Sequence, residues 1–132
     1  MIRGNRMYKY EKLRSTTAID ALFRGGATAY AYPIRATFRA VTAGNYQPVA
    51  RFMITVPKRK LRHAVDRVAM RRRIREQYRL LRPEFFPDAL PEGQRPLHVA
   101  FIYVASNLEP SLRIRQAMQR LLPRLHAPEV AK

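Results

Sequence analysis

The chain is organised around the segment from Lys58 to Arg82, where the positive charge is concentrated. It holds 11 of the 26 Lys and Arg residues, with only Asp66 and Glu76 as acidic residues. If residues 64–82 form a helix, side chains three, four, seven and eight positions apart share a face. One face is then a basic stripe of Arg71, Arg72, Arg75, Arg79 and Arg82. The opposite face is an apolar seam of Met70, Ile74, Tyr78 and Leu81.

A charge run of this kind is often only a solvated helix face. Close arginines, however, repel one another and oppose helix formation unless a polyanion neutralises them. The sequence therefore favours a helix that packs on the domain through its seam and presents its arginines to a polyanion.

Length and charge bound the domain organisation and the partners. With 132 residues the chain fits one domain, which we place at 14–125 between a basic arm at 1–13 and a tail at 126–132. A net charge of +17 indicates nucleic acid, an anionic membrane or an acidic protein as partner. The chain has no cysteine, no membrane-length apolar run and no signal-peptide core. We therefore expect a cytoplasmic monomer that does not bind membranes.

The first half of the chain predicts a helix followed by strands. Ser15 to Thr17 offer N-caps, and Gly25-Gly26 ends a short helix. Apolar residues alternate over 34–41, and 49–56 is β-branched and apolar, so we expect two strands paired as a hairpin. A further short strand is expected near 29–32.

The second half predicts a helix, a strand and a helix. Pro57 ends the second strand, and Pro83 is expected to end the basic helix before a proline-rich loop. The continuous apolar run 97–104 predicts a buried strand, and the apolar stripe from Ile114 to Leu122 predicts a last helix. The strand, helix and strand from 49 to 104 should form a parallel crossover. The expected fold is an α/β sandwich in which a small mixed sheet of about four strands packs with about three helices.

The sequence lacks the usual patterns of catalytic and metal sites. It has no Gly-rich phosphate loop, and His63, His98 and His126 are scattered. Nine acidic residues leave little for acid/base catalysis or for binding hard cations. We expect no catalytic residue, metal site or cofactor in the protein itself. If the chain serves an enzyme, another molecule carries the chemistry.

Aromatic residues offer a second kind of nucleic-acid contact, because bases stack on exposed aromatic side chains. Phe52 and Phe101 alternate within strands and are expected in the core. Phe23 and Phe38 are the better candidates for stacking platforms.

The stretch from Val56 to Arg82 resembles the signature of the bacterial ribonuclease P protein subunit. In that signature a Lys/Arg pair after a strand leads into AVxRNRxKRxxRE and an aromatic residue. The matching positions are Val56, Lys58, Arg59, Ala64, Val65, Arg67, Arg71, Arg72, Arg75, Glu76 and Tyr78. Asp20, Leu22, Phe23 and Gly26 resemble the first helix of the family and its end, and the resemblance covers roughly residues 10–125.

This resemblance implies a small α/β sandwich that binds the catalytic RNA of ribonuclease P and the 5′ leader of precursor tRNA. The RNA, with magnesium, would hydrolyse the phosphodiester, so the chain would be a noncatalytic subunit of an endoribonuclease. The basic stripe and the resemblance together give RNA-binding candidates, which are Lys58, Arg59, Lys60, Arg67, Arg71, Arg72, Arg75 and Arg79. Phe23, with Phe38 and Arg35 from the sheet, would line the cleft for the leader.

One departure from the family pattern affects its central tripeptide, RNR, which reads Arg67-Val68-Ala69 here. Val68 falls between Arg75 and Arg79 in helical angle, where a β-branched apolar side chain has no evident structural reason. Loss of an amide and a guanidinium should weaken docking on RNA. The alternative from another class is a structural RNA-binding protein of ribosomal or assembly type, which would also need a strongly basic helix.

Overall fold

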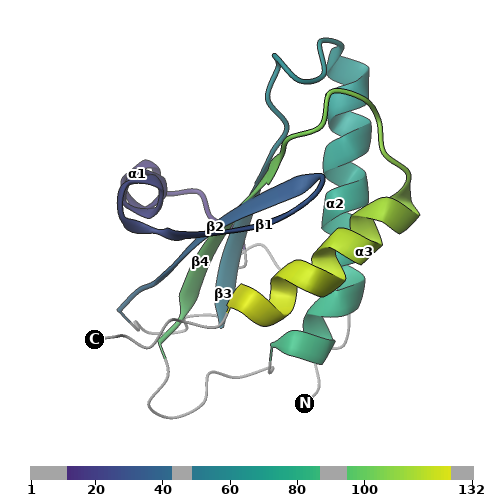
Figure 1. Cartoon of the computed structure of the whole chain (residues 1–132). Helices are drawn as coiled ribbons and strands as arrows, with labels where there is room; N and C mark the ends of the chain where they lie inside the picture. The colour runs from purple at the N-terminus through teal and green to yellow at the C-terminus, as the bar shows by residue number, and fades with distance from the viewer. Residues whose placement is uncertain (1–11, 43–48, 87–94, 126–132) are drawn as a thin grey trace.

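The computed structural model describes residues 12–42, 49–86 and 95–125 (Figure 1). The elements in chain order are α1 (Thr16–Gly25), β1 (Ala27–Ala31), β2 (Ile34–Ala40), β3 (Ala50–Thr55), α2 (Ala64–Phe85), β4 (Leu97–Tyr103), α3 (Ser111–Leu121) and the 3₁₀ turn η2 (Leu122–Leu125). Helix α1 lies on one face of the sheet, and α2 and α3 lie on the other. The predicted sandwich of three helices and a four-stranded mixed sheet is confirmed, including the short first strand.

The pairing of the strands corrects one prediction. The strands at 34–41 and 49–56 do not form a hairpin, because the sheet order is β1-β2-β4-β3. Strand β4 is buried at every position, so it takes an interior place between β2 and β3. It pairs antiparallel with β2 and parallel with β3. The crossover through α2 is therefore confirmed, and the hairpin is formed by β1 and β2.

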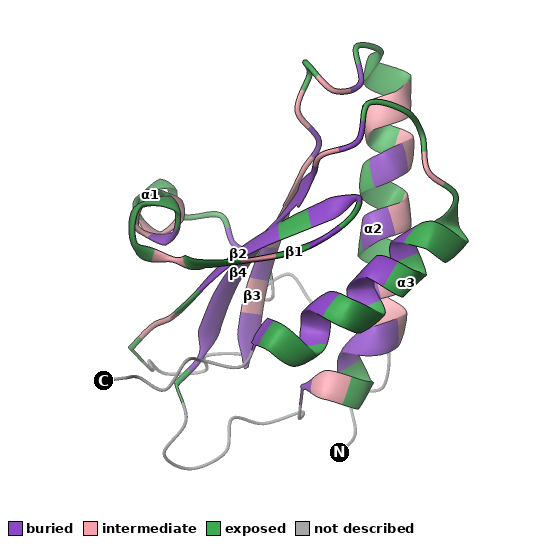
Figure 2. Cartoon of the chain, viewed as in Figure 1, coloured by how far each residue is buried: buried purple, intermediate pink, exposed green. Residues whose placement is uncertain are grey.

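The main core lies between the sheet and the two helices α2 and α3, as the buried positions in Figure 2 show. The Tyr78 ring packs against Phe52 and Phe101, with centroid distances of 4.7 and 5.3 Å. The apolar seam of α2 is buried as predicted, and so is the apolar stripe of α3. The core assignment of Phe52 and Phe101 is confirmed.

A smaller core lies under α1, on the opposite face of the sheet. Ser15 caps the helix by accepting a hydrogen bond from the Ala18 N–H. Gly26 follows the helix where a Cβ atom would lie 2.6 Å from the Leu22 carbonyl oxygen, so a side chain would not fit. Leu13, which we assigned to the basic arm, is buried beside Leu22 and belongs to this core.

The C-terminal end of α2 corrects two predictions. The helix continues through Pro83 to Phe85, and the Phe86 N–H donates to the Arg82 carbonyl. A proline in the last turn removes only one helical hydrogen bond, so the helix tolerates it there. Arg82 is 1% exposed and does not belong to the basic stripe. It follows Tyr78 by four positions, which places it on the seam side of the helix.

Candidate nucleic-acid interface

A groove of about 400 Å³ runs between α2 and the edge strand β3. We call it the α2 groove. Its basic lining residues are Lys12, Arg14, Arg71, Arg72 and Arg75. Its apolar lining residues are Leu13, Phe52, Met53, Ile54 and Val68. The groove therefore combines cationic donors with an apolar wall.

The segment before α1 contributes one side of this groove. Lys12 forms a parallel bridge with Phe52, and the Leu13 N–H donates to the Phe52 carbonyl at 2.7 Å. These contacts bring Lys12 and Arg14 opposite the arginines of α2. Sequence reasoning missed both residues because they were read as part of an arm or its border. Their positive charge was visible, but the pairing with β3 was not.

Arg71 and Arg72 lie in one turn of α2 and Arg75 lies in the next, and all three are exposed to solvent. Within the described residues, none of the three forms an ion pair with a carboxylate. Three close, solvated guanidinium groups repel one another, and a polyanion in the groove would relieve that repulsion.

Arg79 differs from the other predicted arginines because it is paired. Its Nε and Nη2 atoms donate to the two carboxylate oxygens of Glu76 at 3.1 and 2.6 Å. These hydrogen bonds lower the pKa of the Glu76 carboxyl below its ordinary value. The pair is solvent-exposed, so its strength is modest, but it leaves Arg79 fewer free donors than Arg75 has.

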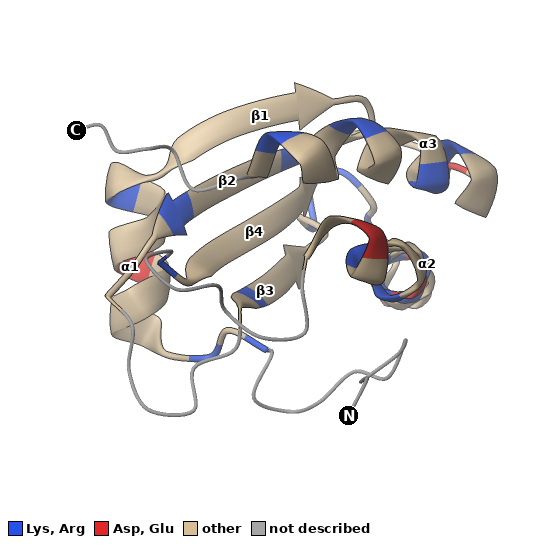
Figure 3. Ribbon diagram, turned by 90° about the horizontal axis from the view of Figure 1, so that it is seen from below, with Lys and Arg blue, Asp and Glu red and all other residues tan. Residues whose placement is uncertain are grey.

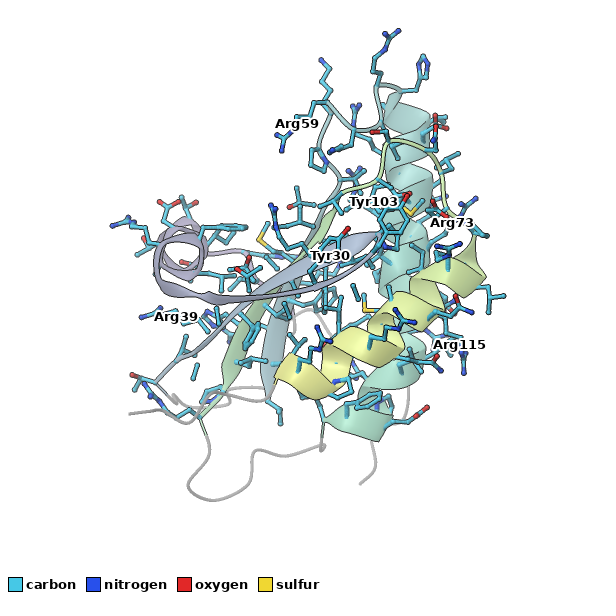
Figure 4. All side chains as sticks on the ribbon, in the orientation of Figure 1. Tyr30, Arg39, Arg59, Arg73, Tyr103 and Arg115 are labelled. Carbon is cyan, nitrogen blue, oxygen red and sulfur yellow. The ribbon has the colours of Figure 1, made fainter. Side chains whose placement is uncertain are left out.

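The N-terminal end of α2 carries the remaining basic candidates. Lys58 and Arg59 are exposed in the turn before the helix, whereas Lys60 is half-buried. Figure 4 shows Arg59 projecting away from the sheet. The Arg67 Nη1 atom donates to the carbonyls of Leu61 and Arg62, both at 2.9 Å. Arg67 therefore holds the loop that leads into α2, while none of these residues lines the groove.

The two altered motif positions differ in exposure. Ala69 is half-buried, whereas Val68 is 37% exposed and lines the α2 groove, as Ile54 of β3 also does. We expected no structural reason for an apolar side chain at position 68, and the structure places Val68 in a groove lining that includes apolar residues of β3. Val68 extends the apolar wall that β3 provides.

The structure separates the predicted leader-cleft residues. Phe38 is 7% exposed in the main core, on the α2 and α3 side of the sheet, so it cannot be a stacking platform. Alternation along β2 places Arg35 on the α1 side, where it is exposed. Phe23 is 47% exposed on α1. Tyr30 lies opposite Arg35 in the sheet and is 52% exposed. The sequence placed Tyr30 among the aromatic residues that could stack on bases, but not among the preferred ones.

The described residues contain no group of three or more His, Asp or Glu side chains that could hold a metal ion. No helix among them is long and apolar enough to cross a membrane. The chemistry this surface offers is recognition, because arginines can donate to phosphate oxygens and an apolar wall can contact the face of a base.

The chain matches known proteins over most of its length. The family model described as Ribonuclease P matches residues 7–126. A ribonuclease P protein component of Porphyromonas gingivalis strain W83 is 32% identical over 119 residues, which cover 89% of this chain and 84% of the relative. The ribonuclease P protein from Thermotoga maritima superposes with a TM-score of 0.67 at 19% identity, covering 89% of this chain and 99% of that one. A Staphylococcus aureus RNase P protein gives a TM-score of 0.64 at 14% identity, with coverages of 85% and 92%. The chain belongs to the ribonuclease P protein family.

Proposed function

We propose that this chain is the RNA-binding protein subunit of a ribonuclease P holoenzyme and that the α2 groove binds the catalytic RNA. The endoribonuclease reaction is carried by the RNA in this family. The observation that supports the groove as the RNA site is the set of three exposed arginines without carboxylate partners in the described part of the chain. Lys12 and Arg14 add charge on the opposite side of the same groove.

The 5′ leader of precursor tRNA is the second proposed ligand. Phe23 and Arg35 are both exposed on the α1 side of the sheet and can contact a base and a phosphate. Phe38 has no part in this proposal because it is buried. The protein would act in the cytoplasm as a monomer, and the magnesium of the reaction would be held by the RNA.

The altered tripeptide should set the affinity of this interface. An asparagine at position 68 could donate and accept hydrogen bonds, and an arginine at 69 could form a bidentate contact with phosphate. Val68 and Ala69 can do neither. We therefore infer that the chain docks on the catalytic RNA more weakly than a relative with the complete tripeptide.

A cleavage assay tests this function directly. The chain is added to the catalytic RNA and precursor tRNA at low magnesium, and the rate of 5′-leader release is measured. Stimulated cleavage is the expected result, with binding that weakens steeply as salt rises because neutralised phosphates release counterions. A purely structural RNA-binding protein would bind the RNA without stimulating cleavage, and that outcome would refute the proposal.

A further inference from the structure

Helix α3 carries a second set of basic residues that the α2 groove does not use. Arg113, Gln116 and Arg120 follow one another at helical spacing along one edge of α3, and Arg124 continues the line in η2. We call these four residues the α3 row. All four are exposed, and no acidic residue occurs in α3. Figure 3 shows the blue positions distributed along the helix.

The α3 row runs beside the edge strand β1. The Arg124 Nη1 atom donates to the Tyr30 carbonyl oxygen at 3.3 Å, which places the end of the row at this strand. At the other end, the charge of Arg113 acts on the Tyr32 hydroxyl, whose pKa is raised mainly by its hydrogen bond to Glu109. The row and β1 therefore form one continuous surface.

The arginines of the row have no acidic partners in the described parts of the chain. The nearby carboxylate, Glu109, accepts a 3.0 Å hydrogen bond from the Tyr32 hydroxyl. Arg113 and Arg120 lie roughly 10 Å apart along the helix, so their charges add at one surface. The row thus presents concentrated positive charge, whereas an ordinary solvated helix would mix both signs.

This surface is separated from the α2 groove by α2 itself. The Arg73 Nη1 atom donates to the Glu109 carbonyl at 2.7 Å, just before α3 begins. Arg73 lies about 160° around the α2 axis from Arg71 and from Arg75. Helix α3 therefore packs on the side of α2 that faces away from the groove arginines.

We propose that the α3 row binds the sugar-phosphate backbone of a second segment of the catalytic RNA, apart from the segment bound at the α2 groove. This proposal rests on the proposed function. Guanidinium and amide groups on a convex helix can donate to phosphate oxygens without reading bases, so this contact is independent of sequence. A membrane is a poor partner because the apolar side of α3 is already buried in the core.

Charge-matched variants of the full chain test the proposal. The triple variant R113Q/R120Q/R124Q removes three charges from the row, and R24Q/R95Q/R115Q removes three exposed charges outside the row, with Arg115 on another side of α3. The affinity for the catalytic RNA is measured at several salt concentrations. We expect the row variant to bind the catalytic RNA at least about tenfold more weakly than the wild type. The slope of log K against log salt should become shallower by about 2. The control should lose clearly less.

A positional probe makes the test independent of affinity. The chain has no cysteine, so an iron chelate can be attached at a single introduced cysteine. Q116C should cleave the catalytic RNA at discrete positions that differ from those cleaved from V68C. Thermal unfolding of each variant shows whether it is folded, and R113Q/R120Q keeps the Arg124 contact with β1 if the triple variant is unstable.

The outcomes separate this proposal from the proposed function. If the wild-type chain does not stimulate cleavage, the proposed function fails. If the wild type stimulates cleavage but the row and control variants bind equally well, only the α3 row is refuted. The α3 row is also refuted if the chelate at Q116C cleaves precursor tRNA at discrete positions but does not cleave the catalytic RNA.

Discussion

Two sides of α2 show opposite chemistry on one helix. The seam side buries Met70, Ile74 and Tyr78 completely. The groove side exposes Arg71 and Arg75 beside the apolar wall of β3. Apolar burial stabilises the fold, whereas exposed, unpaired cations contribute little to stability and much to the binding of a polyanion. Stability and RNA binding should therefore respond to different substitutions on the same helix.

The largest expected effect comes from the seam. Ile74 is fully buried between α2 and the sheet, so Ile74→Ala should lower the free energy of unfolding by about 2–5 kcal/mol. That is a large fraction of the stability of a small domain, so RNA binding should be lost together with folding. Chemical denaturation measures the change, and Ile74→Val should lower stability by only about 0.5–1.5 kcal/mol. Equal stability of the alanine variant and the wild type would contradict the burial of the seam.

The groove side should separate binding from stability. R71Q/R72Q/R75Q removes three cations that do not stabilise the fold, so we expect the affinity for the catalytic RNA to fall at least about a hundredfold. The slope of log K against log salt should fall by about 2 to 3. The melting temperature should stay close to that of the wild type. The matched control is R24Q/R95Q/R115Q, and an equal loss in this control would mean that only net charge matters.

Restoring the family tripeptide should strengthen the binding of RNA on the groove side of α2. V68N/A69R adds an amide and a guanidinium, so binding to the catalytic RNA should tighten by roughly tenfold. Stability should fall slightly because the substitution removes an apolar side chain from the lining of the groove. V68A/A69R keeps the added charge without the amide and shows which residue matters. Unchanged affinity in V68N/A69R would refute the idea that the altered tripeptide weakens docking.

The smallest expected effect is the contribution to stability of the ion pair between Glu76 and Arg79. Hydrogen bonds to Arg79 lower the pKa of Glu76 in the folded chain. The pair therefore stabilises the fold at pH values above the pKa that Glu76 has in the unfolded chain. This small contribution should disappear as the pH falls through the lowered, folded-state value. A carboxyl NMR titration of the wild type and Arg79→Gln measures it. An unchanged Glu76 pKa in the variant would show that the hydrogen bonds do not persist in solution.

The fold was largely predictable because its signals are local in the chain. Spacing within α2 and α3 identified the buried faces, and the apolar run at 97–104 identified the interior strand. The hairpin prediction failed because a stretch from Ala50 to Thr55 looks the same whether its neighbour is β2 or β4. The choice between them depends on the burial of β4, which is a property of the whole sheet.

The candidate site was predictable only in part. Arg71, Arg72 and Arg75 share a helix face and could be grouped from spacing alone. Lys12 and Arg14 reach the groove through pairing with β3, and no periodicity in the chain indicates that contact. Phe38 was assigned to the wrong side because alternation shows that a strand has two faces but does not show which one is buried by α3.

A chemical probe at Val68 shows whether the groove side of α2 docks on the catalytic RNA. Val68→Cys carrying an iron chelate places the only cysteine of the chain in the groove. If the groove binds the catalytic RNA, we expect strong cleavage of that RNA at a few neighbouring nucleotides, and no such cleavage from a chelate at Thr17 on the exposed surface of α1. Weak, dispersed cleavage from position 68 equal to that from position 17 would contradict it.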